Sequence, residues 1–379
     1  MEDYNLWDLE GVHVKVKDCF LKKINNKIFS KFKVKRDFYN QYFKESNLPF
    51  YVFKNMLKSF YCSKFYVPLE FLLNVCDYLD LSKEELQKNV ISYKSQGSVN
   101  FIDKPIFPII INPVFDMIYA HNIGDGTVSI AKNRAPYFAY RQFNRFYREA
   151  YLKKIDFVFG NVIHKQINFK DITRVRCPSV LSSLFFKYYE LDDRGFLSET
   201  ARISSRIFEK GFESMVAVLC AFIIDEGYID STQISIVLKN HLLVEDLKKI
   251  CDRLEYGASI VHKQGDYKDY SGVSILRNGM KRFYEDYVKV NKKYSLIDLG
   301  VKGERIRNSF NIINRQIIRV KGNQDLIISL LKNERLSVNQ LANRINMTRQ
   351  GVRYHIHNLL NDGKIRIIDK AQLNWIYGV

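Results

Sequence analysis

Hydrophobic residues between positions 114 and 312 follow helical spacing and strand spacing in the same order twice. Each copy begins with an apolar helical segment that ends in an acid followed by glycine, IYAHNIGDG at 118–126 and LCAFIIDEG at 219–227. Alternating apolar and polar positions then predict strands, and helical spacing predicts further helices. The predicted strands are 127–130, 137–142, 233–238, 258–262 and 272–276, and the predicted helices are 145–157, 244–254 and 280–288. This order predicts an α+β fold whose sheets each have one apolar and one polar face.

The first hundred residues are rich in lysine and aromatic side chains, and their second half is expected to be helical. Residues 67–86 have apolar side chains at helical spacing, and Ser82 with Glu85 has the pattern of a capping box. Residues 47–57 predict a short helix after a turn, so this domain resembles a phage-repressor helix-turn-helix or is a plain helical bundle. Residues 92–113 contain glycine and three prolines, which predicts a linker or an entry strand and a domain boundary.

The last sixty residues have the pattern of a winged helix-turn-helix. A helix is predicted over 324–331, and Ser337 is expected to cap a second helix. The turn 346–348 leads to a third helix over 349–360. The segments 363–368 and 373–377 then alternate as the two strands of a wing.

The helix over 349–360 is expected to be the recognition helix. Val352, Ile356 and Leu359 share one apolar face. The polar side chains left outside, which suit contacts in a major groove, are Arg349, Gln350, Arg353, Tyr354 and His357. A winged helix used only for protein contacts is the alternative.

Composition and charge point to a polyanionic partner. The chain has 379 residues, a formal net charge of +18 and a pI of about 9.4, with the basic residues spread along its whole length. Nucleic acid is the commonest partner for such a chain, although a lysine-rich proteome would produce the same excess. There is no apolar run of membrane-spanning length, no secretory leader pattern and no Cys/His spacing typical of zinc. A cytoplasmic protein with reduced thiols is expected.

The paired acid–glycine segments predict a site of their own. Ala120 and Ala221 are small enough to let the two helices approach closely, which would bring Asp125 and Glu226 together. The glycine after each acid is expected at a left-handed position that ends the helix. Two neighbouring carboxylates repel each other, and Mg²⁺ would relieve that repulsion and activate water against a phosphodiester.

These two segments resemble the paired motifs of the LAGLIDADG homing endonuclease family in its monomeric, two-repeat form, over residues 114–312. The resemblance implies two αββαββα units related by an internal pseudo-twofold axis. It also implies paired motif helices at their interface and two antiparallel sheets that form a saddle over double-stranded DNA. It places the metal-binding acids at Asp125 and Glu226, with the backbone carbonyls of Gly124 and Asp225 near the metal. It implies cleavage of both DNA strands.

The chain departs from the family pattern in two places. The seventh position, where the helices pack, is Gly124 in the first motif but Asp225 in the second. Asp225 and Glu226 therefore compete for the ligand role, and the family pattern favours Glu226. The sixth position, often Asp in the family, is isoleucine in both motifs.

Further polar residues are candidates for supporting roles. Lys239 ends a strand of the second copy, Gln142 stands near the matching position of the first, and both are expected to assist catalysis. Lys292 and Lys293 follow the last helix of the second copy. The basic residues on or beside strands, expected to contact DNA, are Lys132, Arg134, Arg141, Lys263 and Arg277.

The sequence therefore predicts four parts and one main function. The parts are an N-terminal helical domain (1–100), two repeats (101–200 and 201–315) and a winged helix (320–379). The expected function is a magnesium-dependent, site-specific double-strand DNA endonuclease. A transcriptional regulator that keeps the fold without cleavage and an RNA-splicing maturase are the alternatives.

Overall fold

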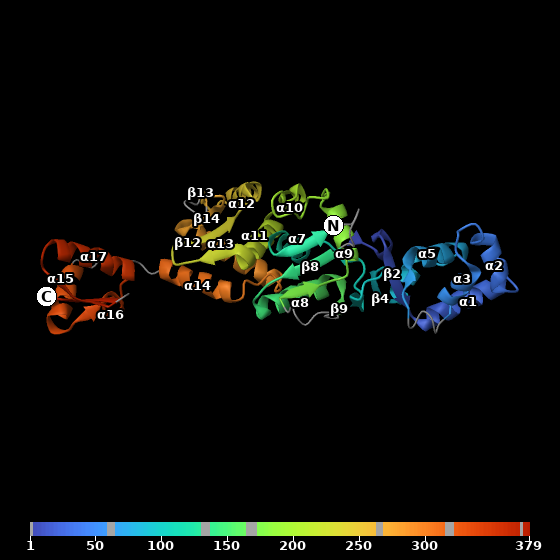
Figure 1. Ribbon diagram of the computed structural model, residues 1–379, viewed down its shortest axis with the longest axis horizontal. Coiled ribbons are helices and arrows are strands. Elements are labelled where there is room, and N and C mark those ends of the chain that lie inside the picture. The colour runs from blue at the N-terminus through green and yellow to red at the C-terminus, as the bar shows by residue number, and fades with distance from the viewer. Residues whose placement is uncertain are drawn as a thin grey trace. The chain divides into compact units, whose positions relative to one another are not determined.

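The computed structural model describes residues 3–58, 65–129, 137–163, 173–262, 268–314, 322–371 and 374–379 (Figure 1). The chain divides into two compact units, Met1–Asn314 and Arg315–Val379. The larger unit contains both acid–glycine segments, and the smaller contains the predicted winged helix. Each unit is described separately.

The first repeat follows the predicted order of elements. It comprises α7 (Pro113–Gly124), β7 (Gly126–Ser129), β8 (Tyr137–Arg141), α8 (Arg145–Phe159), β9 (Asn161–Ile163), β10 (Arg174–Arg176) and α9 (Val180–Tyr188). Asn112 begins α7 because its side chain accepts hydrogen bonds from the amides of Val114 (2.9 Å) and Phe115 (3.1 Å), with proline at the first helical position. Strands β10, β8 and β7 form an antiparallel sheet in that order.

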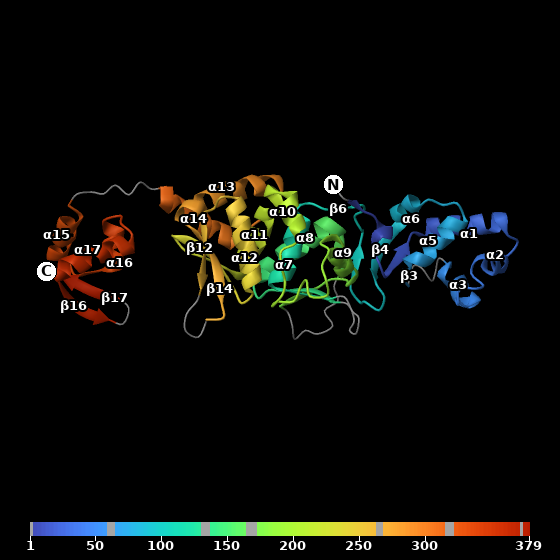
Figure 2. The ribbon, with the colours of Figure 1, turned by 90° about the horizontal axis from the view of Figure 1, so that it is seen from above.

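From its motif helix onward the second repeat has the same order and a fuller sheet, and one short helix precedes it. It comprises α10 (Ser205–Lys210), α11 (Phe212–Glu226), β11 (Gly227–Ile229), β12 (Gln233–Leu238), α12 (His241–Arg253), β13 (Ala258–His262), β14 (Ser271–Leu276) and α13 (Arg277–Lys293). The sheet order is β11-β12-β14-β13, all antiparallel. A further helix that the sequence pattern did not predict, α14 (Val301–Asn314), packs beside α13 (Figure 2).

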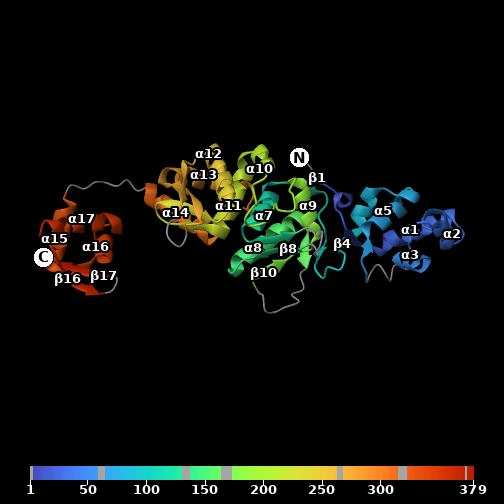
Figure 3. The same cartoon turned by 45° about the horizontal axis from the view of Figure 1, so that its top comes forward.

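Helices α7 and α11, called the motif helices below, pack side by side in the centre of the larger unit (Figures 1 and 3). Every residue of 113–123 and of 214–224 is buried, which explains why both helices are mainly apolar. Ala120 and Ala221 are fully buried, in agreement with the expected close approach.

One buried charge joins the beginnings of the motif helices. Asp116 of α7 is fully buried and accepts hydrogen bonds from Lys210 (2.6 and 2.7 Å), Ser214 (2.6 Å) and Tyr189 (2.7 Å). A buried carboxylate is tolerated only when it is paired and hydrogen-bonded in this way. Asp116 therefore ties the first repeat to the second at the end of the helices opposite the paired acids.

The glycines after the acids have a different role from the one expected. Neither Gly126 nor Gly227 has a positive φ, and φ of Gly227 is −82°. A Cβ at Gly126 would lie 2.4 Å from the backbone of Asn122, and one at Gly227 would lie 2.5 Å from the carbonyl oxygen of Ile223. Glycine is needed at both places because the chain turns back against its own last helical turn, and the expected left-handed conformation is wrong.

The N-terminal part is not the purely helical domain that the sequence predicted. Its elements are β1 (Asp3–Tyr4), η1 (Leu6–Asp8), β2 (Val12–Val16), α1 (Asp18–Lys31), α2 (Lys35–Tyr42), α3 (Phe50–Met56), β3 (Val67–Pro68), α5 (Leu69–Tyr78), α6 (Lys83–Asn89), β4 (Val90–Ser95), β5 (Phe101–Asp103) and β6 (Ile109–Ile110). The predicted short helix is α3, and Ser82 caps α6 by accepting from the amide of Glu85 (3.1 Å). The carboxylate of Glu85 bonds Lys23 (2.5 Å).

A five-stranded sheet crosses the predicted boundary near residue 100. Its order is β3-β2-β4-β5-β9, with β4 paired to β5 and β5 paired to β9 of the first repeat. The fully buried Val14, Tyr93 and Ile102 lie on three of its strands. The N-terminal part and the first repeat therefore share one hydrophobic core, which an expectation based on local prolines could not reveal.

The smaller unit has the expected winged helix-turn-helix order. It comprises α15 (Asn323–Asn333), β15 (Leu336–Ser337), α16 (Val338–Arg344), α17 (Arg349–Asn361), β16 (Arg366–Ala371) and β17 (Asn374–Gly378). Ser337 and Gln340 form a capping box, and Thr348 caps α17 by accepting from the amide of Gly351 (3.1 Å). A core separate from that of the larger unit includes Ile327, Val352 and Leu359.

In the part of the chain that the structure describes, no helix combines the length and the apolar character needed to cross a membrane.

Candidate active site

The two motif acids lie at the C-terminal ends of the packed motif helices. Asp125 follows the last turn of α7 as its C-cap, and Glu226 is the last residue of α11. The amide of Asp125 donates to the carbonyl of His121 (3.0 Å), and the carbonyl of Asp125 accepts from the amide of Arg141 on β8 (2.9 Å). Each acid leads directly into a strand, so the helix packing and the sheet together determine its position.

The carboxylates of these two acids differ in their hydrogen bonds. Oδ2 of Asp125 accepts from Nε2 of Gln142 (3.1 Å), so the predicted supporting residue Gln142 does contact the first acid. Glu226 is exposed, and no side chain or amide in the described ranges donates a hydrogen bond to its carboxylate. Glu226 therefore has its oxygens available to a cation or to water.

The acids influence one another electrostatically. The pKa of Asp125 is raised to about 8, first by burial and then by the charges of Asp225 and Glu226, while Lys302 and Arg141 oppose the rise. The pKa of Glu226 is also raised, first by loss of hydration and then by Asp225. Although Glu226 is exposed as a residue, the atoms around its carboxylate still remove part of its water. Mutual repulsion of this kind favours a bound cation.

Asp225 does not direct its side chain as a metal ligand would. Its side chain is fully buried, with Oδ2 2.9 Å from Nδ1 of His121 and Oδ1 accepting from the hydroxyl of Tyr140 (2.6 Å). A Cβ added at Gly124 would lie 3.0 Å from Oδ2 of Asp225. Glycine at the seventh position of the first motif thus provides the space for the acid at the seventh position of the second, and only the backbone carbonyl of Asp225 remains a candidate ligand.

A buried lysine lies in the same polar cluster. Lys154 of α8 is 1% exposed, and the charges of Asp225 and Asp298 act on it. Burial lowers the pKa of Lys154 to about 8 against these opposing charges. Burial also lowers the pKa of His121, with the charge of Lys154 acting in the same direction. Sequence spacing missed Lys154 and His121 because their partner, Asp225, lies in the other repeat.

Lys302 caps the second motif helix from α14. Its Nζ donates to the carbonyls of Ile223 (2.7 Å), Ile224 (2.7 Å) and Gly227 (2.8 Å). A cation at a helix C-terminus is stabilising, and here it also lies near all three acids. The hydroxyl of Tyr147 on α8 accepts from the amide of Lys302 (3.4 Å), so the cap also contacts the first repeat. The sequence patterns did not single out Lys302, because its helix α14 was not among the predicted elements.

The predicted basic residues Lys239, Arg277 and Lys293 do not pair with the motif acids. Lys239 is exposed, with Nζ 5.3 Å from the ring centre of Tyr270, and among the described side chains it pairs with no acid. Arg277 is exposed at the start of α13, and Lys293 pairs with Glu213 (2.7 Å). The predicted DNA contacts that lie outside the described residues are Lys132, Arg134 and Lys263.

The residues present fit a divalent cation that retains water. Over the described ranges, no three His, Cys, Asp or Glu side chains are grouped closely enough to enclose a metal. Mg²⁺ commonly uses only one or two carboxylates and completes its octahedron with water and substrate phosphate. Asp125 and Glu226, beside the helix-end carbonyls of Gly124 and Asp225, provide oxygen donors of that kind.

The recognition helix of the smaller unit presents the predicted polar face. Val352, Ile356 and Leu359 are buried. The five residues expected to contact DNA, all exposed, are Arg349, Gln350, Arg353, Tyr354 and His357. The predicted orientation of α17 in its own unit is therefore confirmed.

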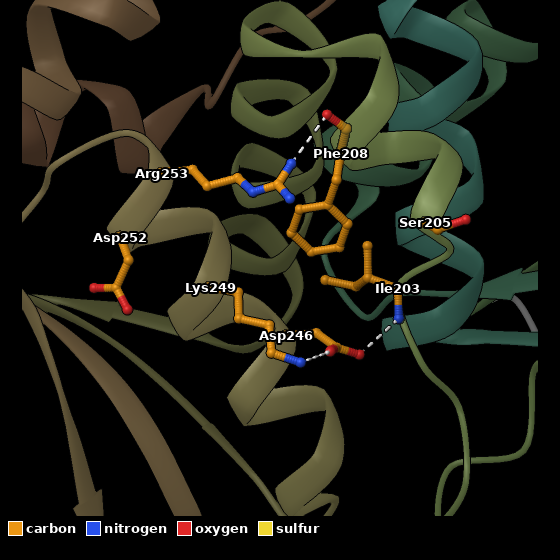
Figure 4. Close-up of a pocket in the computed structure, with 7 residues that line it drawn as sticks. All are labelled: Ile203, Ser205, Phe208, Asp246, Lys249, Asp252 and Arg253. Atoms are coloured by element: carbon orange, nitrogen blue, oxygen red, sulfur yellow. Dashed lines mark hydrogen bonds and ion pairs between the residues drawn. The ribbon is translucent and has the colours of Figure 1, made fainter.

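A hollow of about 460 Å³ lies between α10 and α12 (Figure 4). Its buried acid is already engaged, since Asp246 binds Arg202 (both 2.6 Å) and the amide of Ile203 (3.1 Å). The guanidinium of Arg253 lies 4.8 Å from the ring centre of Phe208 and donates to its carbonyl (3.2 Å). The motif acids do not line this hollow, so it is not part of their site.

Comparisons with known proteins find two separate likenesses. Residues 324–366 match the family described as winged helix-turn-helix DNA-binding. No protein in the comparison with curated sequences matches the chain.

Three solved structures of homing endonucleases are partly similar to this chain. Mesophilic variants of I-DmoI share 17% identity over 46% of this chain and 94% of theirs, with a TM-score of 0.34. I-DmoI in complex with DNA and Ca shares 12% sequence identity over 52% of this chain and 97% of its own, with a TM-score of 0.32. I-WcaI bound to its DNA recognition sequence shares 16% sequence identity over 49% of this chain and 86% of its own, with a TM-score of 0.31. At these identities and TM-scores the likenesses carry no conclusion about the activity or the individual residues of this chain.

Proposed function

We propose that the chain is a site-specific double-strand DNA endonuclease that acts as a monomer and uses Mg²⁺. The observation that carries the proposal is the pair of acids, one from each repeat, at adjacent ends of the motif helices. The charge of Glu226 raises the pKa of Asp125, as expected of carboxylates close enough to share a cation. The net charge of +18 suits a DNA partner.

In this proposal Asp125 and Glu226 hold the metal, with the carbonyls of Gly124 and Asp225 beside it. The bound ion would lower the pKa of a water molecule and stabilise the leaving oxygen of the phosphodiester. Gln142 orients the carboxylate of Asp125 through its hydrogen bond of 3.1 Å. Lys302 holds the end of α11 in place and counters part of the negative charge of the acids.

The DNA would lie against exposed basic residues of both units. Arg141 and Arg277 are exposed at strand and helix ends of the two repeats, and the exposed Lys239 directly follows β12. The candidates outside the described residues, Lys132, Arg134 and Lys263, belong to the same proposed set. The exposed face of α17 would add contacts in a major groove.

The test is cleavage of a host-genomic or randomised DNA library with and without Mg²⁺. Wild-type protein is compared with Asp125→Asn and Glu226→Gln, and binding to the same DNA is measured in parallel. Discrete metal-dependent cuts that both substitutions abolish, with binding retained, are expected. Absence of cuts in wild type together with tight binding in all three proteins would reject the endonuclease.

A DNA-binding regulator without cleavage is the second candidate. The match of residues 324–366 to a DNA-binding winged helix favours it, because a winged helix binds DNA without any cleavage chemistry. The same experiment separates the two functions, since a regulator binds DNA equally well with Asp125→Asn and cuts none.

A further inference from the structure

Lysine and aromatic side chains gather on one face of the N-terminal part, around α2 and α3. This face, called the α2–α3 surface below, comprises Phe29, Lys35, Arg36, Tyr51, Lys54 and Lys58. Positions 51, 54 and 55 fall on one side of α3, and Lys58 follows directly after its last turn. Tyr51 and Lys54 are exposed, and Asn55 between them is partly exposed.

The positive charges of the α2–α3 surface are not neutralised by the protein. No carboxylate in the described ranges pairs with Lys35, Arg36, Lys54 or Lys58. Lysines elsewhere on the same part do pair, as Lys31 does with Asp80 (2.8 Å). Burial lowers the pKa of Lys35, and the charges of Lys54 and Lys58 lower it further, so the three ammonium groups lie near one another. Like charges grouped without counterions favour a polyanionic partner.

Exposed aromatic rings stand among these charges. Phe29 is 53% exposed with Nζ of Lys35 5.8 Å from its ring centre, and Tyr51 is 68% exposed. The guanidinium of Arg36 lies 5.5 Å from the ring centre of Phe50. Rings that contact cations in this way keep the long basic side chains extended over the surface. This limits the conformational entropy that these side chains lose when a partner binds.

The surface rests on a rigid support. Phe38 of α2 and Phe53 of α3 are fully buried, with their ring centres 6.0 Å apart. The hydroxyl of Tyr39 donates to the carbonyl of Leu48 (2.6 Å), which fastens the loop between the two helices. Helix α3 is therefore held in a fixed position with Tyr51 and Lys54 exposed, an arrangement that suits contact with the phosphates of a duplex.

We infer that the α2–α3 surface binds the phosphate backbone of double-stranded DNA, at a place separate from the motif acids and from the smaller unit. The inference goes beyond the proposed cleavage and does not depend on it, because it concerns only the binding of duplex DNA by the intact chain. Lys54 and Lys58 contact phosphates, and Tyr51 lies against the sugar–phosphate edge or a base.

The test measures equilibrium binding of the full-length chain to a labelled mixed-sequence duplex over a range of salt concentrations. Divalent metal is omitted, so that no strand is cut and the result is independent of the endonuclease proposal. The double variant Lys54→Gln/Lys58→Gln is compared with Lys83→Gln/Lys88→Gln, which removes the same charge from exposed positions of the same part. Thermal unfolding of both variants verifies that each is folded.

Each phosphate contact adds about 0.9 to the slope of log affinity against log salt, so Lys54→Gln/Lys58→Gln is expected to reduce the slope by about 2 and weaken binding at low salt. The matched control is expected to keep the wild-type slope. Tyr51→Ala is expected to weaken binding with the slope unchanged. Equal slopes in both double variants would overturn the inference. A loss seen only with single-stranded or duplex RNA of the same sequence would overturn the assignment to DNA.

Discussion

Tyr140 of the first repeat donates a hydrogen bond of 2.6 Å to Asp225, the residue before the terminal acid of the second motif helix. The bond crosses between the repeats and ends on a carboxylate with no exposed side-chain surface. It holds the end of α11 against β8. Strand β8 also contacts Asp125, because the amide of Arg141 donates a hydrogen bond to the carbonyl of Asp125. The ends of both motif helices are therefore joined through Tyr140, a residue that lies outside both motifs.

Removing this hydroxyl is expected to destabilise the larger unit. Tyr140→Phe leaves Oδ1 of Asp225 buried without that donor, which costs about 1–3 kcal/mol. Urea unfolding of the full chain measures the loss. Tyr51→Phe is the control, because Tyr51 is 68% exposed and its substitution should leave the midpoint unchanged. Equal midpoints for the two variants would show that the bond contributes nothing to stability.

Adding a methyl group at Gly124 is expected to push the motif helices apart at their acidic end. The new Cβ in Gly124→Ala would lie 3.0 Å from Oδ2 of Asp225, and overpacking of this kind costs about 1–3 kcal/mol. A double-mutant cycle with Asp225→Ala isolates the steric part. Gly124→Ala should cost much less in the Asp225→Ala background, and an additive cycle would contradict this packing.

Replacing Lys302 is expected to disturb both the helix end and the acids. Lys302→Met removes the donor to three carbonyls, and it removes a charge that lowers the pKa of Asp125, Asp225 and Glu226. Their pKa values then rise further, so the pH of half-maximal cleavage should move upward. Lys302→Arg should restore part of the wild-type profile, and Lys292→Met, at an exposed position, should not move it. A purely structural role would lower the rate at every pH without moving the profile.

The stability of the metal-free protein is expected to fall as pH rises towards 8. Burial raises the pKa of both Asp125 and Asp225 from 3.8 to about 8, so between these values the folded state binds more protons than the unfolded state. These two groups then make stability decrease with increasing pH, and the decrease is clearest above about pH 6.5, because burial lowers the pKa of His121 well below that value and His121 acts in the opposite direction at lower pH. Lys154 acts in the opposite direction only above pH 8, because its pKa is lowered to about 8 from 10.5.

Urea midpoints measured from about pH 6.5 to pH 8 without divalent metal test this dependence. Asp125→Asn should flatten the slope, because it removes one of the two groups. Added Mg²⁺ should raise the midpoint most near pH 8, where the carboxylates are most ionised. A midpoint that stays constant over this range in wild type would contradict the raised pKa values.

The recognition helix supplies a prediction for the smaller unit. Arg353→Ala should weaken binding to the specific DNA site by about 1–3 kcal/mol, the range for loss of a good bidentate base contact. Lys332→Ala is the matched control, since Lys332 is exposed on α15, away from the predicted face. Fluorescence anisotropy with specific and scrambled duplexes checks the result. An equal loss on both duplexes would indicate a phosphate contact instead.

The sequence by itself determined the order of elements and the local ends of many of them. Hydrophobic periodicity located β12 and β13 and the buried face of α17, because that information lies within a few neighbouring residues. The capping side chains Ser82 and Ser337 bond amides three residues away, so they too are visible in the sequence. The repeated acid–glycine ending indicated which carboxylates share one end of the fold.

Only the tertiary structure decided what surrounds those carboxylates. Asp225 turns inward because His121, Tyr140 and the space above Gly124 come from the other repeat. Lys302 reaches the end of α11 from 75 or more residues away, and β9 joins a sheet begun near the N-terminus. Such contacts depend on which surfaces meet when the core closes, and periodicity and capping patterns, being local, carry no information about that closure.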